Sequence, residues 1–320
     1  MRFMTDSRKI VSIVVPFFNE GGNVELFAQG LTPILAELTD IAFEIICVDD
    51  GSDDDTLARL IALAKTDPRF RVIELSRNFG KEAALTAGID HAKGDAVIPI
   101  DADLQDPPEL IAHMIAAWRN GAEVVLARRI DRSVDPVLKQ RSAAWFYRIY
   151  NRLSHLKLPE NVGDFRLMDR VVVDALKTLT EQQRFMKGLF AWVGFRTVTL
   201  DYQRRPRAGG MTKFSGWKLW NLAVEGFTSF STLPLKVWTY IGLAGALATS
   251  AYAVFIVLRT LIIGVDVPGY ASLLVAILFI GSLQLVSIGV LGEYIGRIYM
   301  ESKRRPTYIV RRRYGESDGS

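Results

Sequence analysis

Two residue types that build metal centres and covalent cross-links are scarce in this chain. Its 320 residues include one cysteine, Cys47, and three histidines. A single cysteine excludes an intramolecular disulfide framework and a cysteine-based zinc site. The histidines are His91, His113 and His155, and their separations do not match metal-ligand spacing. The sequence therefore predicts neither a disulfide framework nor a zinc centre built from these residues.

A glycine-rich phosphate loop is also missing from the place where a dinucleotide-binding enzyme would carry it. The first predicted strand is followed by Phe17-Phe18-Asn19-Glu20-Gly21-Gly22 rather than by Gly-x-Gly-x-x-Gly. This absence argues against a redox enzyme with a dinucleotide fold. The net charge of +4 is small and comes mostly from basic residues beside hydrophobic segments near the C-terminus. No nucleic-acid partner is indicated.

Carboxylates are placed where two apolar runs end. Asp49 and Asp50 follow the run 43–48, and Asp101 and Asp103 follow the run 96–100. In an open parallel α/β sheet, ligands bind beyond the carboxyl ends of the strands. Asp101 and Asp103 are two residues apart, so an extended backbone directs both carboxylates to the same side. Such oxygens suit Mg²⁺ or Mn²⁺ with a shell completed by phosphate and water, so the pattern predicts a nucleotide diphosphate ligand.

The first part of the chain alternates short Val/Ile-rich runs with helical patterns, which predicts βαβ units and a parallel sheet. The expected strands are residues 11–15, 43–48, 72–75, 96–100 and 123–127. Apolar residues at helical spacing follow the first two strands, and a further helix opens at Lys81 after Gly80. The predicted fold class is therefore α/β, with a Rossmann-like nucleotide-binding domain.

Two long uncharged runs lie near the C-terminus, at residues 237–258 and 270–292. Each is long enough to cross a bilayer core of about 30 Å as a helix. Basic residues flank the pair and are scarce in the connecting loop, so the positive-inside rule places both termini in the cytoplasm. The short polar segment 1–9 does not resemble a signal peptide. We expect a multi-pass protein of the inner (cytoplasmic) membrane with a cytoplasmic catalytic domain.

Residues 214–235 combine tryptophan, phenylalanine and lysine just ahead of the first hydrophobic run. This composition is typical of helices that lie at the membrane surface. The sequence therefore predicts four parts. They are a catalytic domain at 1–213, interfacial amphipathic helices at 214–235, two transmembrane helices at 236–294 and a basic cytoplasmic tail at 295–320.

Several longer motifs occur in a fixed order along the chain. They are Val14-Val15-Pro16-Phe17-Phe18-Asn19-Glu20, Val48-Asp49-Asp50-Gly51-Ser52, Leu75-Ser76-Arg77-Asn78-Phe79-Gly80-Lys81, Asp101-Ala102-Asp103-Leu104-Gln105-Asp106, Gly163-Asp164-Phe165-Arg166-Leu167-Met168-Asp169 and Arg207-Ala208-Gly209-Gly210-Met211-Thr212-Lys213. With these motifs the chain resembles the family 2 glycosyltransferases with a GT-A fold. It resembles in particular their polyprenyl-phosphate branch, which contains bactoprenol glucosyltransferases and dolichol-phosphate mannose synthases. One departure is Thr212, where a serine is commoner, but the hydroxyl is kept.

The resemblance implies roles for individual residues. The residues that would bind the nucleotide sugar are Pro16, Asn19, Glu20, Asp50, Asp101, Arg207 and Lys213. The catalytic residues would be Asp101, Asp103 and Asp164. Asp103 would hold the cofactor, Mg²⁺ or Mn²⁺, and Asp164 would position the sugar or act as a base.

The acceptor implied by the resemblance is a membrane-bound polyprenyl phosphate. A phosphate monoester has a second pKa of about 6, so it is largely a dianion at cytoplasmic pH and can attack the anomeric carbon without giving up a proton. The expected reaction is a single displacement with inversion, giving a lipid-linked sugar phosphate for the glycosylation of surface polysaccharide or lipid. The residues expected to hold the acceptor phosphate are Arg128, Arg129, Lys139 and Arg141.

Alternatives stay open at this stage. UDP-glucose is the favoured donor, but GDP-mannose, a UDP-N-acetylhexosamine or UDP-galactose would suit the same motifs. A processive polysaccharide synthase would carry Gln-x-x-Arg-Trp, and the nearest segment here is Glu181-Gln182-Gln183-Arg184-Phe185. A third class is a non-catalytic membrane scaffold, against which the intact Asp101-Ala102-Asp103 counts. The sequence also leaves open whether the chain forms a homo-oligomer.

Overall fold

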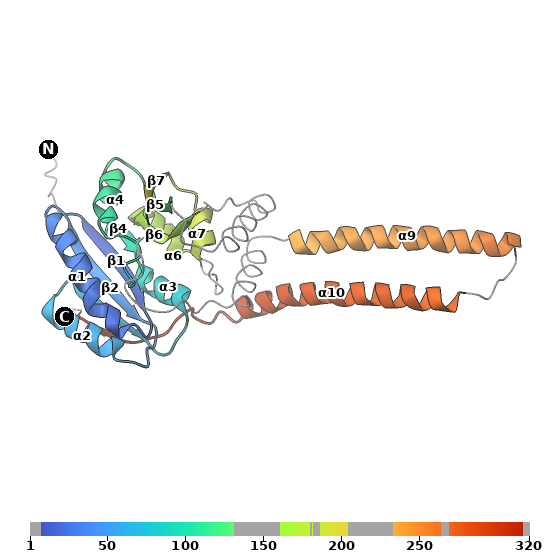
Figure 1. Ribbon diagram of the computed structural model, residues 1–320, viewed down its shortest axis with the longest axis horizontal. Coiled ribbons are helices and arrows are strands. Elements are labelled where there is room, and N and C mark those ends of the chain that lie inside the picture. Colours follow the sequence, from blue (N-terminus) through green and yellow to red (C-terminus); the bar gives the residue numbers. More distant parts are fainter. Residues whose placement is uncertain are drawn as a thin grey trace.

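The computed structural model of this chain describes residues 8–130, 161–179, 181, 186–203, 233–263 and 269–315. Four residues expected to bind substrates, Lys139, Arg141, Arg207 and Lys213, lie outside the described residues. So do residues 214–232 of the expected interfacial segment. The described chain forms a sheet domain covered by helices, and two long helices extend away from it (Figure 1).

An eight-stranded sheet forms the centre of the domain, in the order β7-β5-β6-β4-β1-β2-β3-β8. The strands are β1 (Ile10–Phe17), β2 (Ala42–Asp49), β3 (Phe70–Leu75), β4 (Ala96–Pro99), β5 (Val124–Arg129), β6 (Val162–Asp169), β7 (Thr197–Tyr202) and β8 (Val310–Tyr314). The five predicted strands correspond to β1–β5. Strands β4, β1, β2 and β3 are parallel neighbours, so the predicted α/β class is confirmed.

Helices cover both faces of this sheet. One face carries α1 (Gly21–Glu37), α2 (Thr56–Thr66) and α4 (Leu110–Arg119), and the other carries α3 (Lys81–His91), α6 (Arg170–Lys177) and α7 (Met186–Trp192). Because successive side chains of a strand point to opposite faces, Ile13 of β1 packs in the layer with α1, and the next residue, Val14, packs in the layer with α3. Each fully buried aliphatic side chain contributes roughly 1.5–3 kcal/mol, so the two layers fix the sheet.

Strand β6 departs from the parallel pattern. It lies between β4 and β5 and pairs antiparallel with both. Because it runs against β4, its first residues reach the same edge of the sheet as the carboxyl ends of β1, β2 and β4. This reversal brings Asp164, the third residue of β6, to the edge where the predicted aspartates lie.

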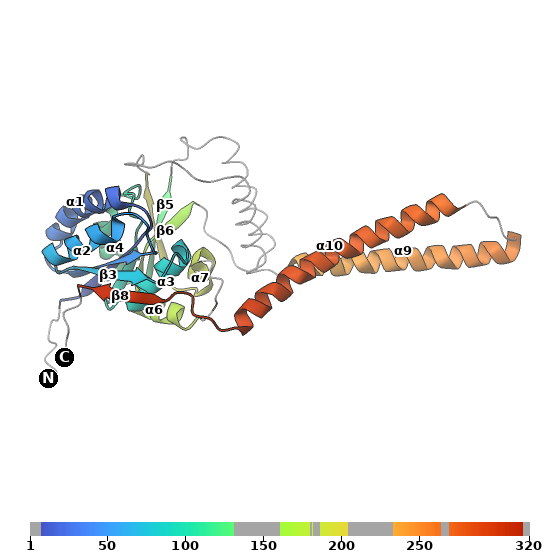
Figure 2. The ribbon, with the colours of Figure 1, turned by 90° about the horizontal axis from the view of Figure 1, so that it is seen from below.

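The two long helices are α9 (Leu233–Ile263) and α10 (Tyr270–Ser302), which run out from the domain and back (Figures 1 and 2). They contain both hydrophobic runs that the sequence predicted to be helical. Among the described residues, one segment, Phe279–Ser302, is long and apolar enough to cross a membrane by length and composition, and its side chains are not buried within the protein.

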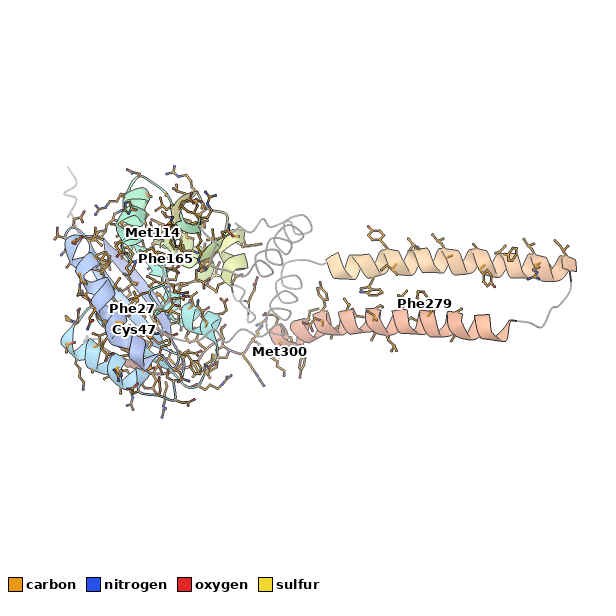
Figure 3. All side chains as sticks on the ribbon, viewed as in Figure 1. Phe27, Cys47, Met114, Phe165, Phe279 and Met300 are labelled. Carbon is orange, nitrogen blue, oxygen red and sulfur yellow. The ribbon has the colours of Figure 1, made fainter. Side chains whose placement is uncertain are left out.

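Apolar side chains therefore occur in two settings (Figure 3). Phe27 and Cys47 lie inside the sheet domain, and burial raises the pKa of the Cys47 thiol well above its usual range. Phe279 lies on α10, in the helical pair, and is largely exposed. A buried thiol of this kind is structural rather than reactive, and an exposed apolar face such as that of α10 is typical of an interaction surface.

The segment after the helices returns to the sheet domain. Helix α10 continues to Ser302, past the expected boundary at 294, and β8 then joins the sheet as an edge strand antiparallel to β3 (Figure 2). The three arginines of β8 can be accommodated because an edge strand has a solvent-exposed side, where charged residues are common. The basic segment expected to form a tail thus contributes a strand to the sheet domain.

Candidate active site

The loops that follow β1 and β2 are joined by hydrogen bonds at the carboxyl edge of the sheet. The Asn19 amide N–H donates to Ser52 Oγ (3.0 Å), and Asn19 Oδ1 accepts from the Asp53 amide N–H (2.8 Å). The Glu20 amide N–H donates to Thr56 Oγ1 (2.9 Å). Asn19 has a φ of 52°, a left-handed conformation that asparagine tolerates better than most residues. Its side chain and backbone thus hold the two loops together.

Two further predicted residues lie in or beside these strands. Pro16 is half-buried near the end of β1, in register with Val48 of β2. Asp50 is buried, and its carboxylate accepts hydrogen bonds from the amide N–H groups of Phe79 (2.7 Å) and Gly80 (2.9 Å). Burial raises the pKa of Asp50, although these two hydrogen bonds act in the opposite direction. The carboxylate therefore fixes the loop that leads into α3.

Asp101 and Asp103 lie in a tight turn after β4. Asp103 Oδ1 accepts from the Gln105 amide N–H (3.1 Å). The residue between these two partners, Leu104, has a φ of 53°, which is unusual for a residue with a branched side chain. Leu104 lies against α1 at Gly30, where an added Cβ would meet Leu104 Cδ1 at 2.9 Å. Close packing on α1 therefore holds this strained turn in place.

Lys81 connects the aspartates of two chain segments, which the sequence did not reveal. Its Nζ lies 2.7 Å from Asp101 Oδ1 and 2.9 Å from Asp164 Oδ2. Burial alone would lower the pKa of Lys81, but Asp164 and Asp101 outweigh it and the pKa is raised. The only signal in the sequence was its place in the motif ending at Gly80-Lys81. Nothing in local spacing predicts a partner on β6.

Glu20 adds a further carboxylate to this edge. Its Oε2 is buried and has no hydrogen-bond partner among the described residues. The pKa of Glu20 is raised, chiefly by burial and further by the negative charges of Asp103 and Asp101. The structure thus brings four acidic side chains and Lys81 into one electrostatic cluster. We name the four acidic residues the carboxylate edge: Glu20, Asp101, Asp103 and Asp164.

Arg128 is one of the two described arginines of the expected acceptor site. It forms a bidentate ion pair with Asp201, with Nε 2.7 Å from Oδ1 and Nη2 2.9 Å from Oδ2. About half of its side chain is exposed to solvent. Arg128 is therefore already paired within the protein, on the outside of the domain.

Arg129, the other described arginine of that set, is more buried. Its Nε donates to the Tyr202 hydroxyl (3.1 Å), which in turn donates to Asp106. Burial would lower the pKa of Arg129, but Tyr202, Asp106 and more weakly Asp101 raise it. Arg129 is therefore within electrostatic reach of the carboxylate edge.

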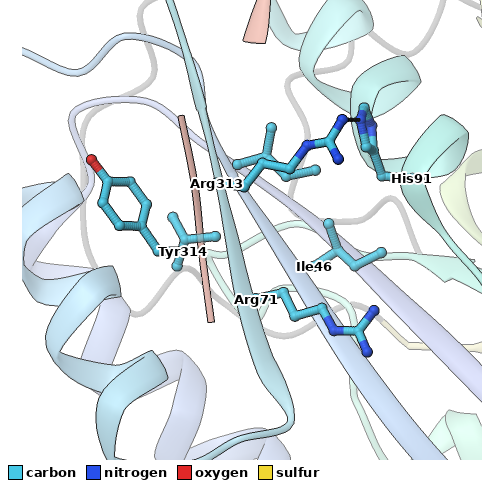
Figure 4. A pocket seen from close by; sticks show the side chains of 7 residues that line it. Ile46, Arg71, His91, Arg313 and Tyr314 are labelled. Atoms are coloured by element: carbon cyan, nitrogen blue, oxygen red, sulfur yellow. Dashed lines mark hydrogen bonds between the residues drawn. The ribbon is translucent and has the colours of Figure 1, made fainter. Parts of the chain in front are cut away.

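The sheet domain also has a pocket away from the carboxylate edge. It is lined by residues from β2, the start of β3, the end of α3 and β8, among them Arg71, His91 and Arg313 (Figure 4). Arg313 Nη2 lies 2.7 Å from His91 Nε2, and Arg71 Nη1 pairs with Glu44 Oε2 at 2.7 Å. These cations are already engaged within the protein. The pocket lies toward the opposite end of the strands from the carboxylate edge.

The carboxylate edge offers oxygen ligands of the kind that a divalent metal ion takes. Among the described residues, no three His, Cys, Asp or Glu side chains converge to form a complete metal site. Mg²⁺ usually takes only one or two protein carboxylates and fills its shell with phosphate oxygens and water. Glu20 Oε2 is buried without a hydrogen-bond partner among the described residues, and the pKa of Glu20 is raised chiefly by burial and further by the charges of Asp103 and Asp101. A cation at this edge would thus be favourable. These residues therefore fit a divalent cation that binds together with a diphosphate.

A sheet with helices on both faces and an acidic edge beyond its strand ends defines an α/β enzyme with a ligand site at that edge. A model of glycosyl transferase family 2 matches residues 12–177, and a model of the GtrB C-terminal hairpin matches residues 233–298. The chain belongs to glycosyl transferase family 2, and it is a glycosyltransferase. The resemblance inferred from the motifs is thereby confirmed.

Similar curated proteins match nearly the whole chain. An uncharacterized glycosyltransferase of Synechocystis sp. is 55% identical over 300 residues, which is 94% of each chain. The bactoprenol glucosyl transferase of Shigella phage SfV is 54% identical over 301 residues, covering 94% of this chain and 98% of that protein. A prophage bactoprenol glucosyl transferase homolog of Escherichia coli is 53% identical over 302 residues, with the same coverage.

Proposed function

We propose that this protein transfers a hexose from a nucleotide diphosphate sugar to a polyprenyl phosphate, with UDP-glucose as the favoured donor. The observation that carries the proposal is the carboxylate edge. In a family 2 chain, it gathers Glu20, Asp101, Asp103 and Asp164 around Lys81, with Arg129 close by. The bactoprenol glucosyl transferases that match the chain along nearly its full length support this acceptor class.

On the donor side, Pro16, Asn19, Glu20 and Asp50 line the nucleotide pocket in this proposal. Asp50 and Asn19 fix loops through backbone hydrogen bonds, which preorganises the pocket before the ligand arrives. Asp103 would hold the divalent cation, Mg²⁺ or Mn²⁺, with Asp101 close to the ribose and the waters of the metal, and the cation would supply positive charge to the diphosphate leaving group. Arg207 and Lys213 complete the donor set from outside the described residues.

On the acceptor side, the lipid phosphate is itself the nucleophile. Because it is largely dianionic at cytoplasmic pH, it needs alignment and relief of repulsion more than it needs a base. Arg129 suits this task because its guanidinium is fixed by Tyr202 and lies near the carboxylate edge. Lys139 and Arg141 complete the proposed acceptor set, and Arg128, which is already paired with Asp201, contributes less. Asp164 orients the sugar, and a single displacement inverts the anomeric configuration.

The helical pair serves to bring the catalytic domain to its lipid. The exposed apolar face of Phe279–Ser302 supports insertion in a membrane, and we extend this to two spans, α9 and α10, preceded by interfacial helices at 214–235. Basic residues on both flanks support the proposal that the sheet domain and both termini lie on the cytoplasmic side of the inner membrane. Reporter fusions after Ser320 should give a cytoplasmic signal, and an external signal would reject this topology.

The test of the proposal is transfer from labelled donors to undecaprenyl phosphate. The full-length protein is given UDP-glucose, UDP-galactose, a UDP-N-acetylhexosamine or GDP-mannose in turn, and undecaprenol, which lacks the phosphate, is the control acceptor. We expect label in the lipid phase with the phosphate acceptor alone, and most from UDP-glucose. Preference for another donor would correct the sugar, and absence of transfer from all four would reject the proposal.

The anomeric configuration of the product tests the mechanism separately. Direct attack on an α-linked donor gives a β-linked lipid phosphate, which NMR of the purified product can identify. A retained α-linkage, or a trapped glycosyl-enzyme adduct, would exclude a single displacement.

A further inference from the structure

Lys81 forms two ion pairs that its position at the start of α3 does not explain. It is the first residue of α3, and a cation at a helix N-terminus is disfavoured by the helix dipole. Its Nζ is nevertheless held by one carboxylate that follows β4 and another on β6, at 2.7 and 2.9 Å. The side chain is therefore directed at the carboxylate edge rather than at the end of its own helix.

The two residues directly before Lys81 are held by Asp50. Asp50 accepts from the amide N–H groups of Phe79 and Gly80, directly before α3 begins. Gly80 has a φ of 100°, a left-handed conformation suited to glycine, which permits this turn into the helix. A continuous series of contacts thus runs from Asp50 through Gly80 and Lys81 to the aspartates of the carboxylate edge. It connects the loops that follow β2, β3 and β4 with strand β6.

Without Lys81, the edge would carry several like charges at short range. Asp101 and Asp164 share one ammonium group, so their oxygens lie no further apart than two such contacts. The charges of Asp101 and Asp103 also act on Glu20. Like charges at such distances repel unless a cation lies between them, and repulsion would move Asp164 away from Asp101.

We propose that Lys81 is a positioning residue that holds Asp164 beside Asp101. Asp164 is then placed to orient the sugar before the donor binds. This inference rests on the proposed function and adds a residue to it. Lys81 acts through the two carboxylates and does not itself hold the acceptor phosphate. Its removal should therefore slow turnover without weakening the binding of either substrate.

The kinetic test compares Lys81→Met, which keeps the length of the side chain, with Lys81→Arg, which keeps the charge. Lys65→Met on the exposed part of α2 is the matched control. We expect Lys81→Met to lower kcat about 100-fold with both KM values within about threefold of wild type. Lys81→Arg should recover at least about a tenth of wild-type turnover, and the control should be unchanged. A large rise in acceptor KM with kcat preserved would overturn the proposal, because Lys81 would then bind the phosphate itself.

A second measurement does not depend on sugar transfer. Thermal unfolding of the substrate-free protein is followed for Lys81→Met, Asp164→Asn and the double variant. Asp164→Asn should leave Tm the same or lower it in the wild-type background, because an ion pair is lost. In the Lys81→Met background the same substitution should raise Tm, because it removes a repulsive charge. If the effect of Asp164→Asn is the same in both backgrounds, Lys81 does not position Asp164. The failure of sugar transfer from every donor would reject the proposed function and leave this unfolding test valid.

Discussion

Two acidic centres lie at opposite ends of the same sheet, and they are built differently. Glu44 of β2 lies toward the amino ends of the strands and is 5% exposed. Its Oε1 accepts from Ser12 Oγ (2.5 Å) and from the amide N–H groups of Lys93 (2.6 Å) and Gly94 (3.1 Å), while its Oε2 pairs with Arg71 Nη1 (2.7 Å). Every oxygen of this buried carboxylate has a donor.

The carboxyl end of the sheet lacks that balance. Glu20 Oε2 and Asp49 Oδ1 are buried without a hydrogen-bond partner among the described residues, and burial raises the pKa of both groups. A buried polar group that is not satisfied within a protein lowers stability, and perturbed groups of this kind gather at functional sites. Buried charge alone therefore does not identify a site. The acidic centre left short of donors is the one that suits a cationic or hydrogen-bonding ligand.

The largest expected effect comes from removing one charge at the carboxylate edge. Asp103→Asn should reduce sugar transfer at least about 1000-fold, equivalent to about 4 kcal/mol, because the amide cannot hold a divalent cation. The Tm should stay close to that of wild type. Transfer assays with Mg²⁺ or Mn²⁺ supplied, together with thermal unfolding, check both halves. Near-wild-type turnover would exclude Asp103 as the metal ligand.

The opposite result is expected at the amino end of the sheet. Glu44→Ala should lower the free energy of unfolding by about 3 kcal/mol, since Arg71 and the Lys93 amide lose the carboxylate that accepts from them. The Gly94 amide keeps Ser12 Oγ as an acceptor. The kcat of the remaining folded protein should be unchanged. Denaturant unfolding combined with active-site titration separates the two quantities. A loss of kcat in fully folded Glu44→Ala protein would show that this centre also serves the chemistry.

A smaller contrast is expected between neighbouring arginines. Arg129→Ala should raise the acceptor KM about tenfold, in line with the loss of a charge-assisted contact to phosphate. Arg128→Ala should change it less than about threefold, because Arg128 is exposed and already paired with Asp201. Steady-state kinetics with varied undecaprenyl phosphate measure both. Equal effects would mean that Asp201 releases Arg128 to the lipid.

The smallest effect concerns the pH dependence of stability. The pKa of Glu20 is raised in the folded protein, so the folded state binds its proton more tightly than the unfolded state. The stability contributed by the protonated form is present below the unfolded pKa and is lost as pH rises through the folded pKa. Glu20→Gln should therefore have a higher Tm than wild type at about pH 7, and the difference should vanish at about pH 4. A Tm difference that does not vary with pH would contradict the assignment.

The local sequence pattern was sufficient to predict the strands and helices of the N-terminal part of the sheet domain. The runs that became β1 to β5 are apolar and short, and helical spacing after them predicted α1 and α2. Strand β8 escaped prediction because Val310-Arg311-Arg312-Arg313-Tyr314 is dominated by positive charge. Its pairing with β3 is set by the tertiary fold, and the solvated side of an edge strand tolerates the arginines.

Part of the carboxylate edge could likewise be predicted from the sequence. Asp50, Asp101 and Asp103 could be placed together because each follows a parallel strand, and all such ends meet at one edge. Asp164 required the motif, since a parallel sheet alone does not predict the reversal of β6 between β4 and β5. Lys81 could not be found from spacing at all. Its partners come from separate parts of the sheet, and only the folded chain brings them to one ammonium group.

The most direct test of the difference between the two acidic centres is a calorimetric titration of UDP, in the presence of Mn²⁺, into three forms of the full-length protein. The wild type and Glu44→Ala should bind UDP with the same affinity, because the amino-end carboxylate has all its partners within the protein. Asp103→Asn should bind at least about 100-fold more weakly, a loss of about 3 kcal/mol. Equal affinity in Asp103→Asn, or loss of binding in folded Glu44→Ala, would contradict the assignment of the carboxylate edge as the nucleotide and metal site.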